Sequence, residues 1–190
     1  MGPGAWDDPG GGFFGNGDLV GGGGVSFLER LRHDAESGAH FDGAIRYMFI
    51  RPDALMGIFA RLEPGARADA LAALGDSIRE QGGHSAASYV AREGVEHLLS
   101  VIEATAPELG WGIWRFHEDA SGALRLTVTN SPFAAAARFE GPVCHAIAGM
   151  AGAVGGLAKG GDCVCREVAC AASGAAACEF VIEPAGGEAR

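Results

Sequence analysis

Apolar residues recur at helical spacing over much of the first half of the chain. They fall on one face of a predicted helix over residues 66–81 and on one face of another over 93–107. Gly82-Gly83 is expected to break or kink the first helix before it resumes through Tyr89 and Val90. The two apolar stripes consist of Ala70, Leu71, Leu74 and Ile78, and of Val95, Leu98, Leu99 and Ile102. This half of the chain is therefore predicted to be mainly helical.

Shorter elements are predicted ahead of these helices. They are a helix from Ser26 to about residue 36, a strand over 44–50 and a short helix from Asp53 to Leu62. Ser26 and Glu29 have the spacing of a capping box, which marks the start of the first helix. Asp53 follows Pro52 and is expected to cap the short helix.

After Gly110 the hydrophobic period changes from that of a helix to that of a strand. Residues 111–117 and 124–129 alternate, and the loop between them is rich in Asp and Gly, which indicates a hairpin. Small residues over 142–157 favour a helix. A second hairpin is predicted from the strands 164–169 and 178–183. The order of helices, hairpin, helix and hairpin predicts an α+β domain with an antiparallel sheet packed against helices.

Length and composition favour one globular domain with a tail. The chain has 190 residues, of which 48% are hydrophobic. Its first 24 residues include eleven glycines, a composition that buries too little apolar surface to offset the entropy of ordering. We therefore expect a flexible tail over 1–24, a single ligand-binding domain over 25–185 and a short tail over 186–190.

Charge and hydropathy exclude several kinds of partner. The formal net charge of -10 would repel the phosphates of nucleic acid, so no direct nucleic-acid contact is expected. No stretch of about 18 apolar residues suggests a membrane span. The residues after Met1 lack the basic and apolar regions of a signal peptide. A cytoplasmic protein is therefore expected, in a reducing compartment that keeps its five cysteines as thiols.

Three thiols and one carboxylate are expected to converge on the C-terminal hairpin. Glu167, Cys170 and Cys178 surround one tight turn, and Cys144 comes from the helix before it. Thiolates favour Zn²⁺, and four protein ligands would fill a tetrahedral site, leaving no place for substrate. The predicted metal is therefore structural.

Two alternatives to this ligand set remain open. Cys163 and Cys165 share the strand face of Glu167, so either could replace the carboxylate or form a redox pair. The cysteines could also be buried small apolar residues without a metal.

Several residues of the second half carry a family resemblance. They are Asn130-Ser131-Pro132-Phe133, Cys144-His145 with Gly149, Val164, Glu167, Cys170, Gly174, and Cys178-Glu179-Phe180 with Ile182. This pattern resembles the 4-vinyl reductase domain family. The family includes bacteriochlorophyll 4-vinyl reductase, ligand-sensing domains of phenol- and xylene-responsive activators, and stand-alone hydrocarbon-binding proteins. The resemblance covers residues 41–183 and implies a fold shared with subunits of vesicle-transport particles.

The resemblance also implies ligands and assembly. In the phenol-sensing members a zinc ion is held by a helix Cys, a strand Glu and two Cys of the final hairpin. The matching residues here are Cys144, Glu167, Cys170 and Cys178. The family further implies a homodimer and a hydrophobic ligand in a cavity between the sheet and the helices.

Aromatic side chains are the candidate lining of that cavity. The proposed residues are Trp111, Trp114, Phe116, Phe133, Tyr89 and His97. Trp111 and Trp114 would lie on opposite faces of one strand, and an aromatic residue on a sheet can equally belong to the core. His97 lies in an apolar helical stripe, where a hydrogen-bonded core histidine is the alternative.

Two functions follow from these patterns. The first is a zinc-containing domain that encloses a hydrophobic or aromatic small molecule as a sensor or carrier. The second is an accessory enzyme or substrate carrier of bacteriochlorophyll synthesis that acts on a tetrapyrrole vinyl group. No nicotinamide, flavin or iron–sulfur motif is recognisable, and the glycine run 152–156 lies within a predicted helix where a dinucleotide loop would follow a strand. Whether any catalysis occurs is left open by the sequence.

Overall fold

The computed structural model describes residues 25–186, except for the side chains of Arg92 and Glu93. The predicted flexible tail over 1–24 lies outside this range, as does most of the short C-terminal tail. Within the described residues no helix is long and apolar enough to cross a membrane.

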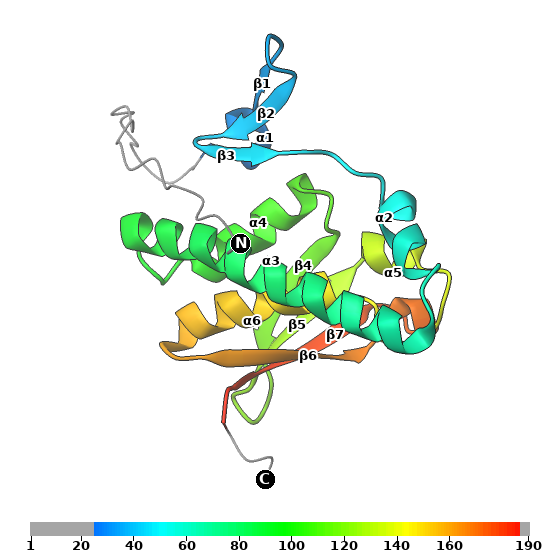
Figure 1. Cartoon of the computed structure of the whole chain (residues 1–190). Coiled ribbons are helices and arrows are strands. Elements are labelled where there is room, and N and C mark those ends of the chain that lie inside the picture. Colours follow the sequence, from blue (N-terminus) through cyan, green and yellow to red (C-terminus); the bar gives the residue numbers. More distant parts are fainter. Residues whose placement is uncertain (1–24, 187–190) are drawn as a thin grey trace, which may run out of the picture.

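An antiparallel sheet of four strands forms one layer of the molecule (Figure 1). Its strands are β4 (Ile113–Glu118), β5 (Leu124–Thr129), β6 (Cys163–Ala169) and β7 (Cys178–Pro184), in the order β4-β5-β7-β6. The two predicted hairpins are therefore present and meet where β5 pairs with β7. Leu124, Leu126 and Val128 are buried on one face, as their alternation predicts.

Two layers of helix cover that face. α6 (His145–Lys159) lies between the sheet and the long helix α3 (Pro64–Glu93), and α4 (Leu98–Glu108) packs beside β4 (Figure 1). The shorter elements are α2 (Pro52–Phe59), α5 (Pro132–Ala136) and the 3₁₀ turn η1 (Ala171–Ser173). The helices and the antiparallel sheet confirm the predicted α+β class.

Glycine allows α3 and α6 to approach closely. A Cβ atom on Gly149 of α6 would collide with the carbonyl oxygen of Gly75 on α3. On α3 itself, a Cβ on Gly82 would collide with the side chain of Met150. The prediction that Gly82-Gly83 breaks the helix is therefore wrong, because these glycines are required by contact with α6 and α3 continues through them.

The N-terminal part forms an arm that the sequence described incompletely. It contains α1 (Phe27–Arg30), β1 (Arg32–Asp34), β2 (Ala39–Asp42) and β3 (Ile45–Tyr47), and the three strands form a separate antiparallel sheet. Figure 1 shows this arm extending from the body beside α4. Phe27 is buried in the arm and contacts Tyr47 edge-to-face, with 5.1 Å between the ring centroids.

Two predictions about this region are corrected. The capping box of Ser26 and Glu29 is present, but α1 ends at Arg30 and does not reach residue 36. Asp34 instead accepts hydrogen bonds from the amides of Glu36 and Ser37, which closes the turn between β1 and β2.

Asp53 does not cap α2. The helix begins at Pro52, so Asp53 lies inside its first turn and its carboxylate contacts Arg51 at 2.6 Å. The predicted strand over 44–50 is also shorter, because only Ile45–Tyr47 pairs with β2.

Candidate functional site: a buried thiol–carboxylate cluster

Cys144, Glu167, Cys170 and Cys178 form a compact cluster, as the sequence predicts. One potential ligand atom from each residue lies within 4.8 Å of those of the other three. We call these four residues the thiol–carboxylate cluster. Its three cysteines are buried, and Glu167 is half-buried.

The secondary structure explains why these four residues meet. Cys144 is the N-cap residue of α6, and Glu167 projects from β6 toward the face that α6 covers. Beyond Glu167 the register of β6 shifts, and the chain turns through η1 and Gly174, whose φ of 92° favours glycine. This turn places Cys170 and Cys178, at the start of β7, beside one another.

Hydrogen bonds fix the orientation of the cluster side chains. The backbone amide of Cys144 donates to Oε2 of Glu167 at 3.0 Å. The sulfur atoms of Cys144 and Cys178 are 3.6 Å apart, and the hydroxyl of buried Ser131 lies 3.2 Å from the Cys144 sulfur. The amide of Ala171 donates to the Cys178 sulfur at 3.4 Å. The cluster is therefore held in place by the backbone of three separate segments.

The cluster has the electrostatic character of a cation site. The hydrogen bond with Cys144 lowers the pKa of Cys178 to about 7, and the amide of Ala171 contributes to this shift. The same contact and burial raise the pKa of the Cys144 thiol, and burial raises that of Cys170 to about 11. Oε1 of Glu167 is buried and has no hydrogen-bond partner among the described residues. Because a buried carboxylate oxygen without a partner is costly, this atom is well suited to a bound cation.

Cys163 and Cys165 lie on the inner face of β6, as predicted, but neither is a member of the cluster. Burial, followed by the nearby charge of Glu167, raises the pKa of Cys165 to about 12. The arrangement therefore includes Glu167, and the two alternative thiols lie outside it.

Four of the six predicted pocket residues gather in the core. We call Trp111, Trp114, Phe116 and Phe133 the aromatic group, in which the Trp111 ring lies 5.4 Å from Phe133 and 6.4 Å from Trp114. Phe116 lies 6.1 Å from Trp114. Trp111 precedes β4, so the expectation that the two tryptophans occupy opposite faces of one strand is wrong. The indole of Trp114 instead donates to the carbonyl of Trp111.

The other two predicted pocket residues lie apart. Tyr89 is half-buried and packs on a small cluster around Leu98 and Val154. His97 is exposed at the N-cap of α4 and makes no side-chain capping bond.

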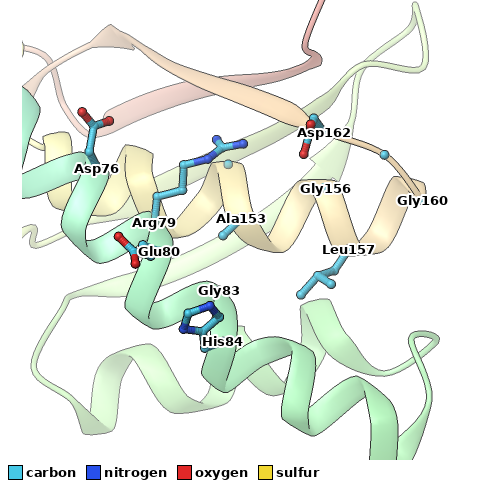
Figure 2. Close-up of a pocket in the computed structure, with 12 residues that line it drawn as sticks. Asp76, Arg79, Glu80, Gly83, His84, Ala153, Gly156, Leu157, Gly160 and Asp162 are labelled. Atoms are coloured by element: carbon cyan, nitrogen blue, oxygen red, sulfur yellow. The ribbon is translucent and has the colours of Figure 1, made fainter. Parts of the chain in front are cut away.

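The structure also contains a hollow that the sequence did not predict. It has a volume of about 800 Å³ and lies between α3 and α6, with Arg79, His84, Gly152, Leu157 and Asp162 among its lining residues (Figure 2). A second hollow of about 60 Å³ lies beside Arg125 and Glu179. Neither is lined by any of the six predicted pocket residues. The repeated glycines of residues 152–161 were the available signal for the larger hollow.

Comparison with known proteins identifies the type of domain. Residues 124–184 match the family model of the 4-vinyl reductase domain, a range that contains all four residues of the thiol–carboxylate cluster. No match was found among curated proteins. Among solved structures, the chain is similar to the phenol-responsive sensory domain of the transcription activator PoxR with phenol. The TM-score is 0.67 at 17% identity, over 83% of this chain and 86% of that one. The resemblance to the 4-vinyl reductase domain family is thus confirmed, by the family match over residues 124–184 and by the fold of a sensory domain over most of the chain.

Proposed function

We propose that this protein is a small-molecule-sensing or carrier domain that encloses a hydrophobic or aromatic ligand. The observation that carries the proposal is the shared fold with a sensory domain described as phenol-responsive. The aromatic group supports it, because two of its members, Trp114 and Phe133, are buried against the inner face of the sheet. Aromatic and apolar walls are the usual lining of a site for such ligands.

Tryptophan fluorescence tests ligand binding directly. The chain has three tryptophans, so Trp6→Phe leaves only Trp111 and Trp114 as reporters. Titration of this variant with phenol is expected to change its emission in a saturable manner, and Phe133→Ala is expected to weaken the response. Saturable binding of a chlorin without any response to phenol would favour the tetrapyrrole function instead. No response to either compound would remove the proposed ligand site.

We further propose that the thiol–carboxylate cluster binds one structural Zn²⁺. The donor set supports this assignment, because three thiols and a carboxylate suit a borderline-soft divalent ion and can complete a tetrahedron. The partnerless Oε1 of Glu167 supplies an independent reason for a cation at this place. A bound ion would join the start of α6 to the β6–β7 hairpin, so metal binding and folding would be coupled.

Metal analysis of single cysteine variants tests the zinc proposal. Cys178→Ser is expected to lose the metal and to melt at a lower temperature than the wild type. Cys163→Ser is the matched control, because Cys163 is a buried thiol of the same hairpin outside the cluster. Full metal content in Cys178→Ser would contradict the assignment.

We also propose that the protein forms a homodimer in the cytoplasm. Met48, Phe49 and Ile50 follow one another and are 78%, 71% and 47% exposed. Consecutive large apolar residues at a surface are typical of an interaction site. A cytoplasmic location agrees with five cysteines that are all present as free thiols.

A further inference from the structure

The hollow between α3 and α6 is a second candidate binding site, separate from the thiol–carboxylate cluster and the aromatic group. Its volume of about 800 Å³ is within the range of small-molecule sites. The helices contact closely at Gly75 and Gly149, and the hollow lies farther along both, toward the turn at Gly160 and Gly161. Its chemistry differs from that of the aromatic group, because charged side chains and glycines line most of it.

Arg79 is held in this hollow by the absence of a side chain on α6. A Cβ atom on Gly152 would lie only 2.6 Å from Nη1 of Arg79, so the guanidinium occupies the space above this glycine. Figure 2 shows the side chain extending from α3 across α6. Arg79 is half-buried and forms no ion pair among the described residues. A planar guanidinium in this position offers paired donors to a carboxylate or phosphate of a ligand.

The other charges of the hollow restrict which anionic ligand can bind. Asp76, Glu80 and Asp162 also line it, so three carboxylates accompany one guanidinium. A polyanion such as a phosphate ester would be repelled by this excess of negative charge. A ligand that also carries an ammonium group would be attracted instead. Figure 2 places Asp162 and Leu157 on the side of the hollow opposite α3, where Asp162 can meet such a group.

We propose that this hollow binds a small zwitterion with one carboxylate, one ammonium group and a short aliphatic body, as in an apolar amino acid or a short peptide. The carboxylate pairs with Arg79, and the ammonium group lies toward Asp162. The aliphatic body packs on Leu157 and Ala153, which line the hollow between the two charged groups. This site is independent of the proposed aromatic-ligand site, so either can fail without the other.

Amide chemical shifts of the full-length protein can test this proposal with matched probes. The probes are leucine, leucyl-leucine, leucinamide, which lacks the carboxylate, and 4-methylpentanoate, which lacks the amine. We expect leucine or leucyl-leucine to shift the amide signals of Gly152, Gly156 and Asp162 in a saturable manner. The zwitterion of the two that binds more tightly distinguishes a free amino acid from a peptide. Leucinamide and 4-methylpentanoate are expected to bind at least about tenfold more weakly, since each leaves one charged partner unpaired.

Two variants locate the binding. Arg79→Gln and Asp162→Asn should each weaken binding of the better zwitterion by about tenfold or more. Arg166→Gln is the control, because Arg166 is exposed on β6 and does not line the hollow. If Arg79→Gln fails to fold, the probe series on the wild type and the exposed Asp162→Asn variant still decide the question. Equal binding of all four probes, binding that is unchanged in Asp162→Asn, or no shift at these glycines would overturn the proposal.

Discussion

Glu167 is the residue in which the chemistry of the thiol–carboxylate cluster is concentrated. It supplies the single carboxylate of that cluster and orients the start of α6 by accepting from the amide of Cys144. Its other oxygen is buried without a partner among the described residues. The residue types and spacing made this cluster predictable, because three of its members lie within one hairpin. The pocket residues were less predictable, since an aromatic residue of a core and one of a ligand site have the same pattern in sequence.

Glu167→Gln tests the role of this carboxylate without changing its shape. The amide can still accept from Cys144 but lacks the negative charge that a divalent cation requires. We expect zinc affinity, measured by competition with a chromophoric chelator, to fall by more than about tenfold, the lower limit seen when a group that merely supports a metal ligand is removed. Asp162→Asn should leave this affinity unchanged. Equal zinc affinity in Glu167→Gln and the wild type would show that the carboxylate is not a ligand.

Asp119 determines the geometry of the loop between β4 and β5. Its carboxylate accepts from the amides of Ser121 and Ala123 and pairs with Arg125 at 2.6 Å. The hydrogen bond from the Ser121 hydroxyl and the contact with Arg125 are the largest causes that lower the pKa of Asp119 below its ordinary value. Asp119 therefore stabilises the folded state while ionised, and this contribution is lost as pH falls through its lowered pKa.

Asp119→Asn should consequently lower the melting temperature at neutral pH. The difference from the wild type should persist down to about pH 4, the ordinary pKa of an aspartate, and shrink below it. Thermal unfolding followed by circular dichroism between neutral and acidic pH measures this difference. Asp76→Asn, on exposed helix surface, is the control. A difference of constant size throughout that range would contradict the assigned role.

At the scale of elements, the success of prediction depended on burial. The strands β5, β6 and β7 alternate because one face is covered by helices, so their bounds agree with the sequence pattern to within about a residue or two. The strands β1, β2 and β3 form a small sheet with little buried surface, and they have no comparable pattern. The continuity of α3 was missed because Gly82-Gly83 suggests a break locally, whereas contact with α6 requires small residues there.

Gly149→Ala tests the close approach of α3 and α6. Its new Cβ would meet the backbone carbonyl of Gly75, which cannot move without displacing α3. We expect a loss of about 1–3 kcal/mol in the free energy of unfolding, as for other overpacked sites. Gly65→Ala is the matched control within α3, because a Cβ atom added there would have nothing within 4 Å and alanine favours helix. Equal stability of the two variants in urea denaturation would contradict this packing.

At the scale of the whole molecule, the arm and the body differ in how they are stabilised. The body has a continuous core around the sheet and α6. The arm is joined to it by few contacts, including the hydrogen bond from the amide of Leu28 to Glu108. The arm also exposes Met48 and Phe49. An arm of this kind is suited to contact a second copy of the chain, which is the basis of the proposed homodimer.

Phe49→Ser is expected to weaken the dimer, because it removes one of the most exposed apolar side chains of the arm. Sedimentation equilibrium should show a larger monomer fraction than in the wild type at the same concentration. Val164→Ser is the control, since Val164 is an exposed apolar residue of β6 on the body. A wild-type protein that is monomeric at all concentrations would exclude the proposed dimer.

Native mass spectrometry of the wild-type protein, purified without chelators, tests the central claim most directly. The claim is that the thiol–carboxylate cluster holds one structural zinc ion in each chain of a ligand-binding domain. The predicted result is a mass increase of one zinc per chain that is retained in the folded charge states and lost on acid unfolding. Folded protein whose mass equals that of the bare chain would contradict it.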